Sequence, residues 1–506
     1  MCSIAGIIGK APDGAVKNML SLQKHRAPDE EGIYKDDHIE LGMGRLKIID
    51  LVSPGLAPYR EDHLVLSYNG EIYNYRELRR ELKRKGWIFK TASDTEVLLK
   101  AWREWGANMF DRLNGMFAFA LYDAKKKELI LARDIAGEKP LYYYHRPHRL
   151  VFSSEAKAIP KVVNVRHQHD KFFEAFQHAF LTTPWKDVVE VPPASYLRYT
   201  IATNKLVITP YWDLTPRSIN LKTAEEELEH LLADAVKLRI RSDVPVGLYA
   251  SGGLDSSLIA DYFNFAHKFY FDNRDARLRQ DFSRNIRRVL WHLDFPVGSF
   301  GFFGMWKLAQ AAAKKVKVVV SGEGADEIFG GYLRYMPIAS EYYLRRHAPS
   351  YTYLFNKHFS PVDYLTSFAN ITKRNEDLAH VKELLKPFFE KFDDPINAMG
   401  YADFKLIFPS LLQMGDRMAG AFGLENRCPF LDKRIIEFGF SLPPEYKIKH
   451  MEQKVILRRI AEKRGLTAVL KKEKHGLSIP YNTWNNRDGW DRSEYFNFLK
   501  KEWREA

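Results

Sequence analysis

Hydrophobic residues in the first 200 positions come in short runs that Gly, Asp and Asn interrupt, a pattern typical of a strand-rich fold. We expect strands at residues 3–8, 64–68, 117–121, 129–132 and 141–144. Two helices fit between these strands, one over residues 75–85 and one over residues 95–105, after a cap at Ser93 and Asp94. The stretches 191–193 and 211–216 are expected to form a junction between domains.

The pattern changes after residue 224, where strand-like and helix-like segments begin to alternate. Residues 225–241 have the period of a long amphipathic helix, and residues 246–250 predict a buried strand followed by a helix over 256–265. A second β-branched run, 316–320, also precedes a turn rich in glycine. This alternation predicts a parallel sheet covered by helices, and the C-terminal third is expected to be mostly helical.

Composition and charge restrict the class of protein. Lys and Arg number 77 against 64 Asp and Glu, so the net charge is +13, which favours an anionic partner such as nucleic acid, a membrane surface or a phosphate-rich substrate. With only two cysteines, a disulfide framework and a cysteine-rich zinc site are excluded. No apolar run approaches the roughly 18 residues of a membrane span, and we expect no membrane partner and a cytoplasmic enzyme.

A cysteine directly after the initiator methionine is the first candidate for chemistry. If Met1 is removed, the free amine of Cys2, with a pKa of about 7.7–8.0, can take the proton from its own thiol. The plain alternative is a small residue at the start of a strand. Asn69 beside the Gly70 N–H supplies the donors of an oxyanion hole. Arg45 suits a substrate carboxylate, and Asp94 suits an ammonium group.

Five segments of the N-terminal half form a wider pattern: 1–9 (MCSIAGIIG), 25–29 (HRAPD), 69–74 (NGEIYN), 93–96 (SDTE) and 132–134 (ARD). In these segments the chain resembles the class II glutamine amidotransferase domain, an N-terminal nucleophile hydrolase. The resemblance implies that Cys2 attacks the side-chain amide of glutamine and that glutamate and ammonia are formed. The implied glutamine-binding residues are Arg45, Leu46, Lys47, Ile48, Ile49, Asn69, Gly70, Glu71 and Asp94.

A second candidate site follows the predicted strand at 246–250 and has the sequence SGGLDSS over residues 251–257. Gly252 and Gly253 allow backbone N–H groups to approach an anion, and the helix that follows adds its positive end. No lysine follows these glycines as it does in the common phosphate loop, and the segment instead resembles the pyrophosphate loop of enzymes that cleave ATP to AMP. Asp255 is placed to hold Mg²⁺.

The third candidate site is the acidic segment 321–332 (SGEGADEIFGGY), which follows the predicted strand at 316–320. Carboxylates spaced by glycine after a strand can hold a metal and act as a base, and a solvated acidic loop is the alternative. Together with 424–432 (LENRCPFLD) and 441–444 (SLPP), the second and third sites resemble the synthetase domain of glutamine-dependent, B-type asparagine synthetases. The resemblance covers nearly the whole chain, and its motifs stand in the family's order.

The resemblance implies a role for individual residues of the second domain. Asp255 and Asp326 would hold Mg²⁺ and pyrophosphate, Lys454 would neutralise the pyrophosphate charge, and Glu323 would act as the base for ammonia attack. The residues implied in binding ATP and pyrophosphate are Tyr249, Ser251, Gly252, Gly253, Asp255, Ser256, Ser257, Phe271, Ser321, Gly322 and Lys454. Aspartate would be activated as an acyl-adenylate, and ammonia would reach it by an enclosed route between the domains.

The fold implied is an α+β plus α/β architecture in two domains. An N-terminal αββα sandwich over residues 1–205 would be the glutaminase, and a parallel-sheet ATP-pyrophosphatase domain with a helical C-terminal part would span residues 215–506. The implied substrates are glutamine, aspartate or another carboxylic acid, and ATP with Mg²⁺. No nucleic-acid partner is expected, and a homodimer is compatible with the sequence.

The sequence departs from the family pattern at several places. Ala27 stands where the family usually has glycine, and it would be strained if its φ were positive. Ala57 stands where the family often has glutamine. The segment between Asp255 and Glu323 is shorter than usual by about one helix and one strand, a unit that would help to wall the nucleotide pocket. Phe295 stands where an acid is common, while Phe271, in a predicted second strand at 269–271, is expected near the adenine.

Two other functions stay open at this point. One is a related ATP-dependent amidotransferase that acts on a different carboxylic acid, because fold does not determine the acid substrate. The other is a catalytically impaired homologue that binds an anionic partner through its basic surface. Cys428 is expected to be a packed thiol, the runs 83–85, 125–127 and 471–472 to be solvated, and the aromatic residues between Trp484 and Trp503 to belong to a packed C-terminal helix.

Overall fold

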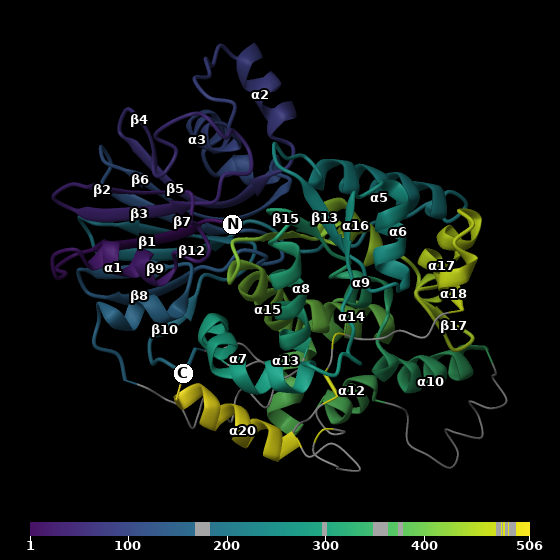
Figure 1. Cartoon of the computed structure of the whole chain (residues 1–506). Coiled ribbons are helices and arrows are strands. Elements are labelled where there is room, and N and C mark those ends of the chain that lie inside the picture. The colour runs from purple at the N-terminus through teal and green to yellow at the C-terminus, as the bar shows by residue number, and fades with distance from the viewer. Residues whose placement is uncertain are drawn as a thin grey trace.

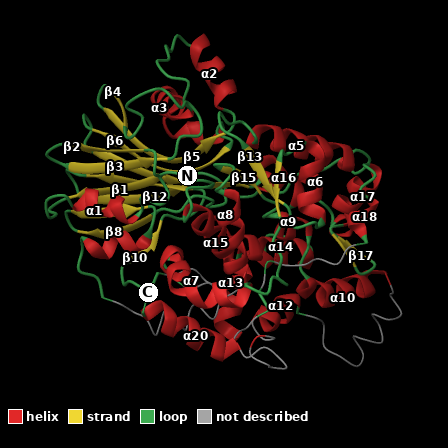
Figure 2. Cartoon of the chain, in the orientation of Figure 1, coloured by secondary structure: helices red, strands yellow, loops and turns green. Residues whose placement is uncertain are grey.

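The computed structural model describes residues 1–166, 183–295, 301–347, 363–372, 378–471, 477, 479–480, 484 and 492–505. Two antiparallel sheets stack in the N-terminal half, and a parallel sheet with most of the helices forms the C-terminal half beside them (Figures 1 and 2). The N-terminus lies between the two halves, and Met1 is fully buried (Figure 1).

The two N-terminal sheets have six strands each, and neighbouring strands are antiparallel in every described pair. The first sheet has the order β10-β8-β9-β1-β3-β2 and consists of β1 (Ser3–Ile8), β2 (Glu30–Lys35), β3 (Ile39–Arg45), β8 (Tyr142–Arg146), β9 (Arg149–Ser153) and β10 (Val188–Glu190). The second has the order β12-β11-β7-β6-β5-β4 and consists of β4 (Tyr59–Glu61), β5 (Leu64–Ile72), β6 (Gly115–Asp123), β7 (Glu128–Arg133), β11 (Ser195–Thr200) and β12 (Lys205–Pro210).

Helices cover the outer faces of this pair of sheets. Helix α1 (Ala15–Leu22) packs on the first sheet beside the short helix η2 (Ala156–Lys161), while α3 (Asp94–Trp105) packs on β5 of the second. Helix α2 (Tyr75–Arg84) lies against α3, and the short helix η1 (Gly106–Asp111) follows α3 directly in the chain. Every residue of β5 is buried, since the strand is covered on both faces. The layers are therefore helix, sheet, sheet and helix, as predicted.

The C-terminal half is built around a four-stranded parallel sheet in the order β14-β13-β15-β16. Its strands are β13 (Val246–Tyr249), β14 (His267–Phe269), β15 (Val318–Val320) and β16 (Glu425–Arg427). The strand predicted at 269–271 lies two residues earlier, because His267 rather than Phe269 begins the pairing with Gly247. Strand β16 is not predicted by the sequence, because its three residues, Glu, Asn and Arg, have no hydrophobic pattern.

Helices surround the parallel sheet and fill the rest of this half (Figure 2). They are α5 (Ala224–Arg239), α6 (Leu254–Tyr262), α7 (Leu278–Leu293), α8 (Gly301–Ala312), α9 (Ala325–Phe329), η3 (Leu333–Tyr335), α10 (Met336–His347), α12 (Tyr364–Thr372), α13 (Leu378–Phe389), α14 (Pro395–Leu406), α15 (Phe408–Gly420), η4 (Pro429–Leu431), α16 (Lys433–Gly439), η5 (Pro444–Tyr446), α17 (Val455–Lys463), α18 (Thr467–Leu470) and α20 (Arg492–Arg504). A small hairpin of β17 (Ile448–Lys449) and β18 (Glu452–Gln453) precedes α17.

Several local predictions can be compared directly with these elements. Strand β1 has the predicted bounds, and the Ser93 hydroxyl caps α3 by accepting a hydrogen bond from the Thr95 amide at 3.1 Å. The predicted C-terminal packing is confirmed for α20, since the Phe498 ring stacks on Phe282 of α7 with their centroids 6.1 Å apart. Residues 485–491 of that prediction lie outside the described residues. No helix in the described part of the chain is long and apolar enough to cross a membrane.

Charged side chains that are buried join the two halves. Arg427 of β16 lies 3.2 Å from Glu71 of β5, and Arg26 lies 2.8 Å from Asp416 of α15. An ion that is buried without its partner costs free energy. These pairs therefore favour one fixed placement of the N-terminal half against the C-terminal half.

Candidate active sites

Cys2 immediately precedes β1 and lies beside Asn69 of β5. Its backbone amide donates a hydrogen bond to Asn69 Oδ1 at 2.9 Å, and its carbonyl accepts one from Arg26 Nε at 3.3 Å. Burial raises the pKa of the Cys2 thiol, while the neighbouring terminal ammonium and the Leu46 amide act against that rise. The thiol is therefore in a dry environment, where a nearby base is needed to ionise it.

Asn69 and Gly70 carry the features of an oxyanion hole. Asn69 is fully buried, and while its Oδ1 accepts from Cys2, its Nδ2 is a buried donor without a hydrogen-bond partner among the described residues. A Cβ atom on Gly70 would lie 2.1 Å from the Met116 carbonyl oxygen, so only glycine fits at this position. An unpaired amide donor beside a nucleophile is the arrangement that stabilises a developing oxyanion.

The two predicted charged contacts to glutamine, Arg45 and Asp94, are both buried close to this point. Arg45 Nη2 donates to the carbonyls of Ile49 and Asp50 at 2.8 and 2.7 Å, so the guanidinium shapes the loop over residues 46–50. Asp94 accepts from Tyr68 Oη at 2.9 Å and from the Ile72 amide at 3.0 Å. Burial raises the pKa of the Asp94 carboxyl, and these two hydrogen bonds oppose the rise.

The other residues predicted to contact glutamine have polar groups that bind other parts of the protein. Lys47 Nζ pairs with Glu30 at 3.4 Å, and the Ile48 carbonyl accepts from the Asp243 amide of the C-terminal half at 3.0 Å. Glu71 pairs with Arg427, so its carboxylate is directed at the interface between the halves. The structure thus brings Cys2, Leu46, Asn69 and Gly70 together, whereas the charged ends of Lys47 and Glu71 have partners of their own.

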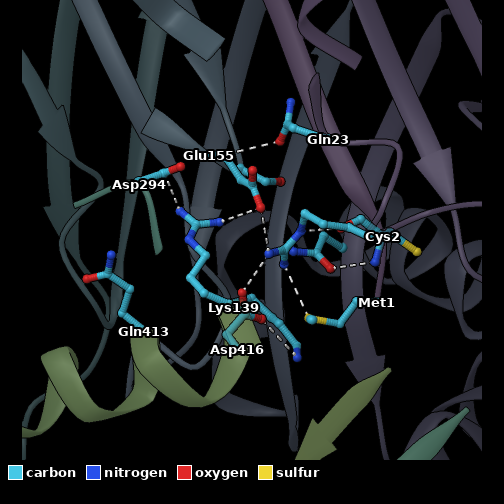
Figure 3. Close-up of polar contacts among 12 residues, drawn as sticks. Met1, Cys2, Gln23, Lys139, Glu155, Asp294, Gln413 and Asp416 are labelled. Atoms are coloured by element: carbon cyan, nitrogen blue, oxygen red, sulfur yellow. Dashed lines mark hydrogen bonds and ion pairs between the residues drawn. The ribbon is translucent and has the colours of Figure 1, made fainter. Parts of the chain in front are cut away.

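Met1 precedes Cys2 in the structure and is part of the same buried cluster (Figure 3). Its terminal nitrogen lies 3.5 Å from Glu425 Oε2, and its sulfur accepts from Arg26 Nη2 at 3.2 Å. The amine that would serve Cys2 as a base exists only once Met1 has been removed.

A second candidate site is a cavity of about 590 Å³ at the carboxyl ends of β13 and β15. This is the edge at which ligands bind to parallel sheets. The cavity is lined by Tyr249, Ala250, Ser251, Asp255, Ser256, Phe271, Asp272, Asn273, Arg274, Gly301, Met305, Leu308, Ser321, Gly322, Glu323, Asp326, Tyr332, Leu411, Met414 and Leu477. Most of the predicted nucleotide residues are in this set, whereas Gly252, Gly253, Ser257 and Lys454 do not line it.

The loop between β13 and α6 has the form expected for binding an anion. Gly252 has a φ of 70°, and Gly253 caps α6, whose first turn contains Asp255. The Ser251 hydroxyl accepts from the Gly253 amide at 3.2 Å and lies 3.1 Å from the Ser256 hydroxyl. The start of α6 and two hydroxyls therefore converge on the cavity, where phosphate oxygens would find donors.

Lys454 contacts both the loop between β13 and α6 and the acidic segment 321–332. Its Nζ lies 2.7 Å from both Asp255 and Asp326, and although burial opposes it, these two carboxylates raise the Lys454 pKa. A Cβ atom on Gly331 would lie 2.0 Å from Asp326 Oδ1 and 2.2 Å from Lys454 Cε, which explains the glycine there. Both carboxylates contact the same cationic group, and donors for phosphate lie beside them. This arrangement fits the way in which Mg²⁺ is held together with a nucleotide.

Glu323 lies on the cavity wall and is partly buried. Burial raises the pKa of its carboxyl to about 7, against the opposing effect of hydrogen bonds from Cys428 and Asn426. Asn426 Nδ2 donates to Glu323 Oε2 at 2.9 Å, and the Cys428 thiol is 3.4 Å from the same oxygen. Cys428 is packed, as predicted, and it also touches this carboxylate. A carboxyl with a pKa near 7 is suited to accept a proton at neutral pH.

The departures from the family pattern have local consequences. Ala27 is not among the residues with positive φ, so the predicted strain is absent, and Ala57 is buried. In spite of the short segment after Asp255, the cavity is walled by Phe271, by residues 272–274 and by Met305 and Leu308 of α8. Beside Phe295, the buried carboxylate of Asp294 lies 2.9 Å from Arg417.

Four residues near the two sites were missed as candidates. Arg26 contacts Cys2, Asn426 contacts Glu323, and Leu411 and Met414 line the cavity. Arg26 and Asn426 lie within motifs that carried the resemblance, whereas Leu411 and Met414 stand in an ordinary amphipathic helix that gives no local signal.

Comparisons with known proteins match two parts of the chain to two different families. Residues 1–212 match the family described as glutamine amidotransferase domain, and residues 227–269 and 263–494 match the family described as asparagine synthase. The second match is split in the segment after Asp255 that is shorter than usual.

Curated relatives and solved structures are similar to the chain to different degrees. The chain is 30% identical to asparagine synthetase [glutamine-hydrolyzing] 1 of Bacillus subtilis, over 97% of this chain and 89% of the relative. It is 33% identical to a putative glutamine-hydrolyzing asparagine synthetase 2 of Methanocaldococcus jannaschii, over 66% of this chain and 76% of the relative. The glutamine phosphoribosylpyrophosphate amidotransferase structure from B. subtilis overlaps 55% of this chain and 70% of its own, with 18% identity and a TM-score of 0.32.

Proposed function

The chain belongs to the family of glutamine-hydrolysing asparagine synthetases, and from that premise we propose how its two sites divide the reaction. The enzyme makes asparagine from aspartate, with glutamine as nitrogen donor and with ATP cleaved to AMP and pyrophosphate. The observation that carries the assignment is the combination of two features: an Asn69 Nδ2 donor beside Cys2 that has no hydrogen-bond partner among the described residues, and a separate cavity lined by Ser251, Asp255 and Glu323. We assign residues 1–205 to the glutaminase and residues 215–506 to the synthetase.

Glutamine hydrolysis begins once Met1 has been removed. The α-amine of Cys2 takes the thiol proton, and the thiolate adds to the side-chain amide carbon of glutamine. Asn69 Nδ2 and the Gly70 N–H stabilise the oxyanion, ammonia leaves, and water hydrolyses the thioester to glutamate. Arg45 binds the glutamine carboxylate and Asp94 its ammonium, and the segment over residues 46–49 with Glu71 completes the pocket.

Aspartate is activated in the cavity of the second half. Its side-chain carboxylate attacks the α-phosphorus of ATP, so that β-aspartyl-AMP forms and pyrophosphate leaves. Ser251, Ser256 and the start of α6 donate to phosphate oxygens, while Lys454 offsets their charge. Gly252, Gly253 and Ser257 keep a supporting role in the loop, and Tyr249, Phe271, Ser321 and Gly322 border the nucleotide.

A divalent cation belongs to this assignment as a cofactor. Asp255 and Asp326 would hold Mg²⁺, because both carboxylates reach the single cationic Lys454 Nζ and so can share one small cation. Bound there, Mg²⁺ supplies positive charge to the phosphate oxygens.

Amide formation requires a base for the attacking nitrogen. Ammonia adds to the acyl carbon of β-aspartyl-AMP, Glu323 accepts a proton from that nitrogen, and AMP leaves with the bond to the acyl carbon broken. The pKa of about 7 makes Glu323 a competent base at neutral pH. Both cysteines are free thiols, which suits the reducing cytoplasm that we propose as the location. A homodimer stays a prediction.

The test is to measure AMP, pyrophosphate and the amide product with Mg²⁺-ATP, aspartate and either glutamine or ammonium. Wild type is expected to form asparagine with both donors, while Cys2→Ala keeps only the ammonium reaction. If wild type forms AMP only with another acid from a panel that includes glutamate, β-alanine and a sugar acid, the assignment of aspartate is wrong. If it forms no AMP with any acid, the assignment of the cavity is wrong.

A further inference from the structure

Helix α15 touches both candidate sites. Near its start, Leu411 and Met414 line the nucleotide cavity. Within the next turn, Asp416 (labelled in Figure 3) and Arg417 reach the N-terminal half, where Asp416 pairs with Arg26 and Arg417 with Glu155. Because the cavity contacts and the interface contacts lie on one continuous helix, a shift of the helix at the cavity would also move Asp416 and Arg417.

One branch of the buried charges leads from α15 to the nucleophile. Asp416 Oδ2 lies 2.8 Å from Arg26 Nη1, and Arg26 Nε in turn donates to the Cys2 carbonyl at 3.3 Å. Arg26 is fully buried and Asp416 is 4% exposed, so water does not screen their attraction. Burial would raise the pKa of Asp416, but Arg26 and Lys139 hold it below its usual value, and the carboxylate is charged at neutral pH.

A second branch starts at Arg417 of the same helix and reaches Arg26 only through an intermediate, Glu155, whose Oε1 lies 3.3 Å from Arg26 Nη1. Arg417 Nη2 lies 2.9 Å from Asp294, and Arg417 Nη1 lies 3.2 Å from Glu155. Asp294 also pairs with Lys157 at 3.0 Å and accepts from the Ala156 amide at 2.7 Å. Asp294 thus joins the halves as Asp416 does, but it has no contact with Arg26 or Cys2 among the described residues, which makes it a matched control.

We propose that α15 couples the two active sites, and that Asp416 is a positioning residue that holds the Cys2 backbone through Arg26. This inference rests on the function proposed above. A nucleotide in the cavity packs against Leu411 and Met414 and fixes the helix. The fixed Asp416 then holds Arg26, and the Cys2 carbonyl, in one place, so that the thiol meets the glutamine amide more often in the reactive orientation.

The test compares glutamine hydrolysis with and without a nucleotide that cannot react. The probe is α,β-methylene-ATP with Mg²⁺, whose bridging carbon prevents release of pyrophosphate. In wild type the probe is expected to raise kcat/KM for glutamine on the order of tenfold. In Asp416→Asn the ratio of kcat/KM for glutamine with the probe to kcat/KM without it is expected to fall to about one, because the neutral amide holds Arg26 less firmly. Ammonium-dependent asparagine synthesis is retained in Asp416→Asn.

The control variant is Asp294→Asn, which removes a buried carboxylate of the same interface. It is expected to lower the unfolding temperature and to keep the wild-type ratio. A ratio near one in wild type, an unchanged ratio in Asp416→Asn, or an equal loss in both variants would each overturn the proposal. If Asp416→Asn does not fold, Leu411→Ala tests the cavity end of the helix and is expected to reduce the ratio in the same way.

Failure of this proposal can be told from failure of the proposed function. Wild type that hydrolyses glutamine and forms AMP with aspartate, but shows no effect of the probe, contradicts the coupling alone. Wild type that does neither contradicts the function on which the coupling rests.

Discussion

Glu425 and Asn426 are neighbours on strand β16, and their side chains reach different active sites. Glu425 Oε2 lies 3.5 Å from the terminal nitrogen of Met1, next to Cys2, whereas Asn426 Nδ2 donates to Glu323 at 2.9 Å. Successive side chains of a strand point to opposite faces, so one strand serves both sites. A route past this strand that excludes bulk water would suit ammonia, which loses its nucleophilicity when it meets bulk water and is protonated.

Removal of the Asn69 amide is expected to impair glutamine hydrolysis. In Asn69→Ala the donor for the oxyanion is lost, and kcat for glutamine hydrolysis should fall by about 10²–10³-fold. Release of glutamate measures the effect. Synthesis with ammonium is the internal control, and an equal loss of that activity would mean that Asn69 has a structural role instead.

The base assigned to the synthetase site predicts a pH dependence. Because the pKa of Glu323 is about 7, the fraction in the basic form, and with it asparagine synthesis from glutamine, should rise as the pH increases from 6 to 8. Glu323→Gln should lower synthesis by about 10²–10⁴-fold and remove the rise.

Glu327→Gln is the matched control for that profile. Burial also raises the pKa of Glu327, to about 8, but its carboxylate accepts a hydrogen bond from Tyr332 and does not line the cavity. The wild-type pH profile should persist in this variant. A wild-type profile in Glu323→Gln would contradict the role of Glu323 as base.

Crowding at Gly331 is expected to separate the two activities. In Gly331→Ala the new methyl group would displace Asp326 and Lys454, and a misplacement of about 1 Å can lower a rate on the order of 10²-fold. AMP formation should show this loss, while glutamine hydrolysis without ATP should continue. Normal AMP formation would mean that Asp326 and Lys454 need not hold their observed positions.

The buried charges between the halves are expected to matter for stability. Arg417→Met leaves Asp294 and Glu155 without one of their cationic partners, and breaking a buried pair costs about 3–5 kcal/mol. The urea concentration at the midpoint of unfolding should therefore be clearly lower in Arg417→Met than in wild type. Arg277→Ala removes the exposed pair with Asp275 and should change stability by less than about 1 kcal/mol, so equal shifts in the two variants would refute the argument.

Local sequence was sufficient for part of this architecture. The cap at Ser93, the glycine at position 70 and the loop after β13 each have chemistry that is specific to a turn or a close approach, and all three are where the sequence analysis expected them. Their residue types follow from conditions within a few positions along the chain.

Other features depend on contacts between residues far apart in the chain. Strand β16 is polar because its side chains meet Glu71, the N-terminus and Glu323, and none of these lies near it in sequence. Asp416 and Arg26 are 2.8 Å apart although they belong to different halves. A pattern of hydrophobic positions contains no information about such partners, so neither the strand nor the buried charges could be predicted from it.

The most direct test of the account is to follow the nitrogen from one site to the other. Glutamine labelled with ¹⁵N at the side-chain amide would be supplied together with unlabelled ammonium, Mg²⁺-ATP and aspartate, and the asparagine formed would be analysed by mass spectrometry. If ammonia passes directly from Cys2 to Glu323, asparagine should contain far more ¹⁵N than the ammonium pool. Asparagine with the isotope content of the pool would contradict a direct connection between the two sites.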